Sequence, residues 1–381
     1  MVSRRMKRSI AVIAGVVVAL LLFELLSSVV LMYYYRITRS GQGVFEREPG
    51  PLSSVNLVVA VVRRVWDAED EPEPNAKERP EFNKKTEPSP FLVADSVLGY
   101  RAAPGAYVHS YFRRDSKRED WRAFRVKVTI NSDGARWTGL PVRPGLRNVW
   151  IFGDSFTFGS GVNDEQTFSF LVQHAMPDRN VRLFALGGYS LTQAYLNLTR
   201  LRDEIGPDDV IVLGYADFYD LRHALAPSRL RRAESFRKQF SPDRLEDNFR
   251  LPRASLDPAG ALKFDYIAEN CRYNSGYCDR DDPPAAYRTG VTAALINAIA
   301  RSTPARVFVL HFDGEVDNPV FAAIDSSVTR IRALDGDFDY EVRDDIEGFD
   351  PHPGPYWHHA ISRRLLEHLP PVREGLQSSR D

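Results

Sequence analysis

The second half of the chain repeats one pattern, in which short continuous apolar runs alternate with longer helical stretches. The apolar runs are NVWIFG, VRLFALG, DVIVLGY and RVFVLHF, at residues 148–153, 181–187, 209–215 and 306–312, with a weaker fifth, FDYEV, at 338–342. Helices are predicted over 165–176, 191–204 and 356–369. Continuous apolar strands between helices are typical of a parallel sheet that is covered on both faces. The pattern therefore predicts an α/β domain with a doubly wound, flavodoxin-like sheet of five parallel strands.

The chain divides into four predicted parts. These are a cytoplasmic tip with a membrane anchor (1–40), a polar, Pro-rich linker (41–90), a small β-rich lead-in (91–145) and the α/β domain (146–372). Within the α/β domain, residues 218–284 are too many for an ordinary connection between a strand and a helix, so we interpret them as an insertion. The insertion is rich in arginine, which could bind an acidic polymer or could simply form a solvated surface.

Residues 9–34 form an apolar segment long enough to cross a bilayer as a helix. More basic residues precede this segment than follow it, so the positive-inside rule predicts a cytoplasmic N-terminus. The run is too long for a cleaved signal peptide, which favours a single-pass anchor in the inner (cell) membrane and a periplasmic or extracellular main domain. Glu24 lies near the middle of the segment, where it would pair with a membrane partner or else be protonated or locally solvated.

The chain has two cysteines, Cys271 and Cys278, with the turn-forming residues 274–276 between them. In an exported domain such a pair is expected to form a small disulfide loop. A zinc site would need further ligands, and none stands at a suitable spacing. The formal net charge is −1, and the sequence contains no phosphate loop and no dinucleotide fingerprint. We therefore expect no metal, no cofactor and no nucleic-acid partner.

Candidate catalytic residues follow the predicted strands, at the end of the sheet where doubly wound proteins place their sites. Ser155 lies in the turn after the first strand, where its hydroxyl would face a cleft or would merely cap a helix. Gly187 and Gly188 follow the second strand, where a backbone N–H could reach an oxyanion or the glycines could form an ordinary turn. Asp350 and His352 precede the last helix. An imidazole oriented by a carboxylate is the base that a serine hydroxyl needs.

Three segments resemble the SGNH (GDSL-like) hydrolases. IFGDSFTFGSGV is similar to the first block of that family, FALGGYSLTQ to the second, and DPHPGPYWHHAISRRLLEHL to the closing block, in the family's order and over about residues 145–370. TINSDGARWTG and LGYRAAPG are similar to the lead-in of membrane-anchored bacterial members. The resemblance implies the three-layer α/β/α SGNH fold and a serine hydrolase of the ester-bond class.

The resemblance also implies roles for individual residues. Ser155 is implied as the nucleophile, His352 as the general base and Asp350 as the orienting partner of His352. The backbone N–H groups of Ser155 and Gly188 are implied as oxyanion donors. The family usually has two residues between the final Asp and His, whereas here only Pro351 intervenes, so a backbone carbonyl could orient His352 instead.

A second departure concerns the third block, where the family has an asparagine that donates to the oxyanion. Ala216 stands at that place, and an alanine side chain has no donor. Asp217 is a candidate replacement in the oxyanion hole, as are Tyr219 and Arg222, which lie nearby in the sequence. An ordinary role in the loop is the alternative for each of the three.

The leading functional hypothesis is a membrane-anchored, extracytoplasmic serine esterase or deacetylase, or an O-acyltransferase, that acts on acyl esters of an envelope glycan. The alternative is a catalytically weak or inactive SGNH-fold protein that binds carbohydrate or serves as a scaffold in an envelope assembly. The missing asparagine and the shortened spacing between Asp350 and His352 favour this alternative. A lipid-acting esterase is a third hypothesis and would require an apolar groove.

Overall fold

The computed structural model describes residues 81–114, 121–231, 250–312, 318–333 and 352–369. The chain divides into two units, Met1–Arg79 and Pro80–Asp381, and all described residues lie in the second unit. The predicted anchor at 9–34, including Glu24, lies outside the described residues. Within the described ranges, no helix is both long enough and apolar enough to cross a bilayer.

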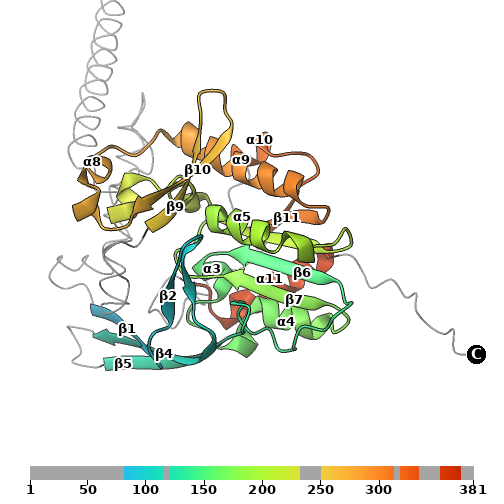
Figure 1. Cartoon of the computed structure of the whole chain (residues 1–381). Coiled ribbons are helices and arrows are strands. Elements are labelled where there is room, and N and C mark those ends of the chain that lie inside the picture. Colours follow the sequence, from blue (N-terminus) through green and yellow to red (C-terminus); the bar gives the residue numbers. More distant parts are fainter. Residues whose placement is uncertain (1–80, 115–120, 232–249, 313–317, 334–351, 370–381) are drawn as a thin grey trace, which may run out of the picture. The chain divides into compact units, whose positions relative to one another are not determined.

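A five-stranded parallel sheet forms the centre of the described part (Figure 1). Its strands are β6 (Asn148–Gly153), β7 (Asn180–Ala185), β8 (Val210–Tyr215), β11 (Arg306–His311) and β12 (Thr329–Arg332). They are arranged in the order β12-β11-β8-β6-β7, and every neighbouring pair is parallel. This is the flavodoxin-like order, so the predicted five-stranded parallel sheet is confirmed. The order reverses between β6 and β8, and sites in such sheets lie at this switch point.

The fifth strand of the sheet differs from the expectation. The sequence pattern indicated residues 338–342, which lie outside the described residues, whereas the strand that pairs with β11 is Thr329–Arg332. In this short edge strand two arginines alternate with Thr329 and Ile331, and only Ile331 is fully buried. β12 therefore lacks the continuous apolar run that identified the other four strands.

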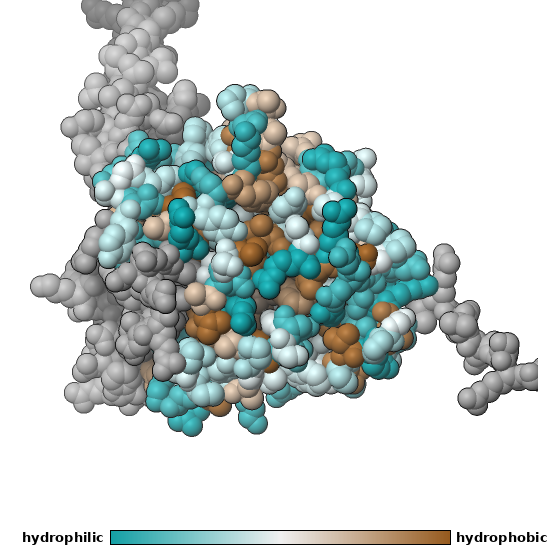
Figure 2. All heavy atoms as spheres, in the orientation of Figure 1, coloured by the Kyte–Doolittle hydropathy of each residue, from teal (hydrophilic) through white to brown (hydrophobic). Residues whose placement is uncertain are grey.

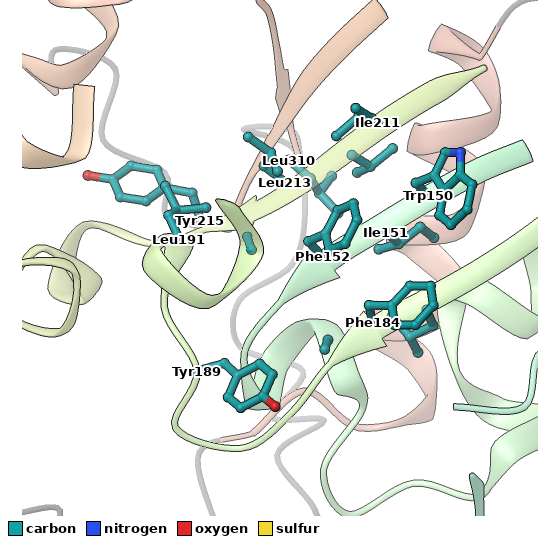
Figure 3. Packing of buried hydrophobic residues seen from close by; sticks show 14 of the residues in the cluster. Trp150, Ile151, Phe152, Phe184, Tyr189, Leu191, Ile211, Leu213, Tyr215 and Leu310 are labelled. Carbon is teal, nitrogen blue, oxygen red and sulfur yellow. The ribbon is translucent and has the colours of Figure 1, made fainter. Parts of the chain in front are cut away.

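Large side chains from neighbouring strands fill the core of the sheet (Figure 3). Trp150 and Phe152 on β6 both stack on Phe184 of β7, with ring centroids 6.1 and 5.9 Å apart. The indole N–H of Trp150 donates to Asp209 at 2.9 Å, so the one polar atom of this buried side chain is satisfied. All six residues of β7 and of β8 are buried, as expected for strands covered on both faces.

Helices cover both faces of this sheet (Figure 1). On one face α5 (Leu191–Arg200) packs against α9 (Ala285–Ser302), and on the other α4 (Phe168–Ala175) packs against α11 (Pro355–His368). Four further helices have four residues each: α3 (Ser155–Phe158), α6 (Asp220–His223), α8 (Ser275–Cys278) and α10 (Val320–Ala323). The described part therefore has the three α/β/α layers that the resemblance implied.

The lead-in consists of two small antiparallel sheets. One contains β1 (Glu81–Glu87), β4 (Gly105–Arg114) and β5 (Trp121–Ile130), and the other pairs β2 (Leu92–Asp95) with β3 (Gly99–Ala102). The linker was expected to continue to residue 90, but β1 pairs with β4 from Glu81 onward. β1 has the sequence EFNKKTE and lies at the edge of its sheet. Backbone hydrogen bonds can hold such an edge strand without an apolar face, which is why its polar sequence looked like a linker.

The predicted insertion contains a hairpin and a disulfide. The hairpin joins β9 (Arg250–Leu256) to β10 (Leu262–Ala268). Cys271 and Cys278 then form a disulfide with their Cα atoms 5.7 Å apart, which confirms the pairing expected from the sequence.

Candidate active site

Ser155 lies where β6 ends and α3 begins, beside the switch point of the sheet. The residue that caps α3 is Asp154, whose extended backbone makes the turn and whose carboxylate accepts the N–H of Phe156 at 3.0 Å. The Ser155 hydroxyl is therefore not the helix cap. It donates instead to the carboxylate of Asp154, at 3.3 Å, and Ser155 is 7% exposed. This leaves its oxygen available for chemistry at the carboxyl end of the sheet.

Thr157 fixes how closely α3 approaches the sheet. A Cβ atom added at Gly214, at the end of β8, would lie 1.9 Å from the Thr157 hydroxyl oxygen. That hydroxyl is buried and has no hydrogen-bond partner among the described residues. The absence of a side chain at Gly214 therefore allows α3, and with it Ser155, to sit directly on the end of the strands.

Gly187 and Gly188 run alongside Ser155 after β7. A Cβ atom at Gly187 would lie 4.0 Å from the Cβ atom of Ser155, and Gly188 has a φ of +83°, which glycine adopts without strain. Within the described ranges, neither the N–H of Ser155 nor that of Gly188 has a hydrogen-bond acceptor. Two open N–H groups beside a serine hydroxyl are the arrangement that an oxyanion hole requires.

Tyr100, on β3 of the lead-in, holds this glycine turn in place. Its hydroxyl donates to the carbonyl of Gly187 at 2.7 Å, and the Tyr189 hydroxyl donates to the carbonyl of Tyr100 at 2.6 Å. Burial raises the pKa of Tyr100 far above its usual value, so the hydroxyl stays protonated and remains a donor. Tyr100 is not among the site residues predicted from the sequence, because no spacing rule connects a lead-in tyrosine with a turn 87 residues later.

Arg222, on α6, reaches the site from the beginning of the insertion. Its Nη1 atom donates to the same carboxylate oxygen of Asp154 that accepts the Ser155 hydroxyl. The guanidinium also lies over the ring of Tyr219, 4.7 Å from the centroid, and 5.6 Å from the centroid of Phe218. The Asp154 side chain is 2% exposed and that of Arg222 is 18% exposed. This ion pair therefore places a permanent positive charge next to the candidate nucleophile.

His352 lies at the same end of the sheet as Ser155. Its ring centroid is 5.2 Å from that of Phe156, the residue that directly follows Ser155. The His352 side chain is half-buried, just before α11 begins. The structure thus brings the serine and histidine segments together, although they are far apart in the chain. Asp350 lies outside the described residues, and its role stays a prediction.

Asp217 follows β8 as expected, but its carboxylate is an acceptor in a hydrogen-bond chain. Arg330 Nη2 lies 2.9 Å from Nδ1 of His311, and because a guanidinium only donates, Nδ1 accepts and Nε2 carries the proton. Nε2 then donates to Asp217 at 2.7 Å, and Asn318 donates to the same oxygen. Burial opposes ionisation of Asp217, but these hydrogen bonds outweigh it and lower its pKa. An ionised carboxylate has no proton to give an oxyanion, so Asp217 does not replace the donor that Ala216 lacks.

Two further histidines of the closing segment, His358 and His359, take different positions. His358 is fully buried, its Nδ1 accepts the N–H of Phe168 at 3.2 Å, and burial lowers its pKa to about 3. His359 is exposed. Within the part of the chain that the structure describes, no group of three or more His, Cys, Asp and Glu side chains could hold a metal ion.

Arg136 connects the lead-in to the loop after α3. Its buried guanidinium donates to Asp164 at 2.9 Å and to the carbonyls of Phe158, Gly159 and Val162 at 2.6 to 2.8 Å. These carbonyls belong to the segment GSGV and its neighbours, directly after the short helix that carries the candidate nucleophile. Arg136 therefore fixes that segment from outside the α/β domain.

Comparisons with known proteins give likenesses of fold. No protein-family model and no curated protein matches the chain. Similar solved structures include a member of the lipolytic G-D-S-L family from Veillonella parvula (12% identity, 58% of this chain and 97% of that chain, TM-score 0.33) and a lipase from a goat rumen metagenome (13% identity, 58% and 96%, TM-score 0.31). A protein of Bacillus subtilis is similar at 12% identity, 76% of both chains and a TM-score of 0.31. All three identities are below 25% and all three TM-scores are below 0.5, so these likenesses assign no property to this chain.

Proposed function

We propose that this chain is a serine hydrolase of the SGNH (GDSL-like) type that acts on ester bonds, with Ser155 as its nucleophile. The observation that carries the proposal is the arrangement around Ser155 at the switch point of the sheet. The hydroxyl lies at the end of β6, beside the two open N–H groups of Ser155 and Gly188. The ring contact between His352 and Phe156, the residue that follows Ser155, supports His352 as the base.

In the proposed reaction Ser155 Oγ attacks the ester carbonyl while its proton passes to the imidazole of His352. The carbonyl oxygen becomes an oxyanion that accepts from the N–H groups of Ser155 and Gly188. Collapse of the tetrahedral intermediate expels the alcohol, which takes the proton from His352, and leaves an acyl-enzyme. Asp350 keeps its predicted role as the partner that orients His352. Before attack, the Ser155 hydroxyl leaves Asp154 by rotation about its Cα–Cβ bond.

The substrate is proposed to be an acyl ester of an envelope glycan, with either water or a sugar hydroxyl as the acceptor. Water would make the protein an esterase or deacetylase, and a sugar hydroxyl would make it an O-acyltransferase. The predicted membrane anchor at 9–34 supports a position outside the cytoplasm, and the disulfide between Cys271 and Cys278 suits an oxidising compartment. A reporter enzyme fused after residue 381 and active only outside the cytoplasm would test this topology.

A lipid-acting esterase would need a broad apolar groove at the site. On the face shown in Figure 2, hydrophobic side chains form small patches separated by hydrophilic ones. Among the large hydrophobic side chains, Phe218 is 47% exposed and contacts Phe156, with ring centroids 5.7 Å apart. Among the described residues, the exposed Phe218 ring beside charged Arg222 suits the edge of a sugar or a short acyl group better than a long lipid chain.

A fluorophosphonate probe, which phosphonylates an activated serine, tests the proposal directly. Wild-type protein should be labelled on the peptide that contains Ser155, and it should hydrolyse p-nitrophenyl acetate. Ser155→Ala should lose both properties. Ser160→Ala, in the same segment, is the matched control and should keep both. Folded wild-type protein that is neither labelled nor active would contradict the proposal.

One observation favours the alternative of a carbohydrate-binding or scaffold protein. Ala216 is fully buried at the end of β8, where the SGNH family has its asparagine donor, so the side-chain part of the oxyanion hole is missing at that place. A protein of this second kind would bind an acetylated glycan in a calorimetric titration without releasing acetate. Release of acetate that depends on Ser155 would exclude it.

A further inference from the structure

The site needs a side-chain donor from some position other than residue 216. The Ala216 methyl group is buried and donates nothing, and the Asp217 carboxylate is occupied as an acceptor by His311 and Asn318. Loss of a comparable donor typically lowers kcat by about 100-fold to 1,000-fold, which is large enough to decide whether the site is an efficient enzyme. The donor must therefore be sought among the polar side chains that reach Ser155.

Arg222 is such a side chain, because it shares a hydrogen-bond acceptor with Ser155. Both Arg222 Nη1 and Ser155 Oγ donate to Oδ2 of Asp154. Two donors on one oxygen atom lie within the sum of two hydrogen-bond lengths of each other, about 6 Å. The guanidinium therefore lies near enough to Ser155 Oγ for an oxyanion formed next to that oxygen to come within its reach.

The guanidinium of Arg222 is held firmly but is not fully used. Asp154 binds one edge of it, and the ring of Tyr219 lies 4.7 Å from its central carbon. Its hydrogen bond in the described residues is made through Nη1, which leaves the N–H groups of Nε and Nη2 for another acceptor. The side chain is 18% exposed, so it borders the solvent from which a substrate arrives.

We propose that Arg222 is a catalytic residue of this site and donates from its guanidinium to the oxyanion, in the place of the asparagine that Ala216 replaces. The inference rests on the proposed function. As Ser155 Oγ forms a bond to the carbonyl carbon, the π electron pair moves to the carbonyl oxygen and the serine proton moves to His352. The oxyanion then accepts from Arg222 as well as from the backbone of Ser155 and Gly188. The electron pair re-forms the carbonyl when the alcohol leaves with the proton from His352, which gives the acyl-enzyme. Water or a sugar hydroxyl then attacks the acyl carbon, gives its proton to His352 and releases Ser155, which takes that proton back.

This role also assigns a function to Asp154. Its carboxylate anchors the Arg222 guanidinium beside Ser155 and holds the Ser155 hydroxyl until that hydroxyl rotates to attack, which makes Asp154 a positioning residue. Because the charge of the guanidinium is permanent, the donor favours the negatively charged intermediate over the neutral ester. The effect of Arg222 should therefore fall on kcat and leave KM almost unchanged.

The test compares Arg222→Gln and Arg222→Lys with wild type, using p-nitrophenyl acetate. Arg222→Gln should lower kcat by about 100-fold or more with KM within a factor of about three. Arg222→Lys can still pair with Asp154 but lacks the forked guanidinium, and its loss of kcat should be smaller. Arg253→Gln is the matched control, because Arg253 is paired with Asp265 in the same insertion and should leave kcat unchanged.

A second readout separates a direct contact from a structural role. A boronic acid forms a tetrahedral anion on the serine, so Arg222→Gln should weaken its binding by the same factor as kcat. A purely structural role would instead raise KM or lower the melting temperature of both Arg222 variants, and the loss of boronic acid affinity would not equal the loss of kcat. Active wild-type protein together with a folded Arg222→Gln variant of wild-type kcat overturns this inference alone. Wild-type protein without labelling or turnover overturns the proposed function as well.

Discussion

The Tyr100 hydroxyl lies 2.7 Å from the point that a Cβ atom at Gly188 would occupy. The same hydroxyl donates to the carbonyl of Gly187, so the tyrosine can neither retreat nor turn without losing that bond. The lead-in hairpin and the turn after β7 therefore fit together only with glycine at position 188. In this way a residue outside the α/β domain shapes the proposed oxyanion hole.

Gly188→Ala should lower kcat for p-nitrophenyl acetate by at least about tenfold, because the turn must shift to relieve the contact with Tyr100. The positive φ adds about 1 to 2 kcal/mol of backbone strain for an alanine. Gly134→Ala is the matched control, since Gly134 has a φ of +88° but no atom within 4 Å of the added carbon. Gly134→Ala should lose a similar amount of stability through backbone strain and should keep the wild-type kcat. Equal kcat in the two variants would contradict the predicted steric role.

Arg136→Met should destabilise the fold by about 3 to 5 kcal/mol in urea denaturation. The substitution leaves Asp164 as an unpaired buried charge and leaves three buried carbonyls without their donor. Arg364→Met, which breaks a surface ion pair with Glu367, should cost less than about 1 kcal/mol. If both variants lose the same small amount of unfolding free energy, Arg136 does not fix the segment after α3.

The sequence could predict most of the fold, because burial on two faces leaves a direct mark on a strand. Every residue of β7 and β8 is buried, and their apolar runs were recognised on that basis. β12 and β1 also lie at sheet edges, but in these two strands polar residues alternate with apolar ones or replace them. Backbone hydrogen bonds are enough to hold such strands, so hydrophobicity alone does not reveal them.

For the site, the sequence indicated the residues that follow the strands but not the contacts between them. Ser155 and Gly188 could be placed from strand ends and glycine turns. Tyr100 and Asp154 act through tertiary contacts, one across 87 residues and the other across 68. Arg222 could be named as a candidate donor, but its shared acceptor with Ser155 becomes evident only when α6 and α3 are brought together.

Gly214→Ala should strongly destabilise the protein, because the added carbon would lie 1.9 Å from the Thr157 hydroxyl oxygen. Thr157→Ala removes that oxygen, which has no hydrogen-bond partner within the described ranges, and should itself cost less. The double variant removes the worst contact and leaves the added carbon 3.1 Å from Thr157 Cβ and from Phe312, so we expect a favourable coupling of about 1 to 3 kcal/mol in a double-mutant cycle. Urea denaturation of the four proteins gives this coupling. Strictly additive effects would show that Thr157 does not fill the space beside Gly214.

Two buried histidines should make the stability of the fold fall in acid. Burial lowers the pKa of both His223 and His358 from 6.5 to about 3, so both are neutral in the folded protein at pH 5. In the unfolded chain both histidines take up a proton below about pH 6.5, whereas in the folded protein they do so only near pH 3. Their contribution to the free energy of unfolding is therefore complete above pH 6.5 and is lost as the pH falls from 6.5 to 3. At pH 5 each histidine should account for a loss of about 2 kcal/mol.

His358→Asn tests this prediction, because an asparagine oxygen can still accept the N–H of Phe168 that His358 Nδ1 accepts at 3.2 Å. The variant should lose about 2 kcal/mol less than wild type when urea denaturation at pH 7.5 is compared with pH 5. His359→Asn, an exposed position on the same helix, is the matched control. An asparagine does not titrate in this range. If His358→Asn loses as much unfolding free energy between pH 7.5 and pH 5 as wild type does, His358 does not contribute to the acid sensitivity.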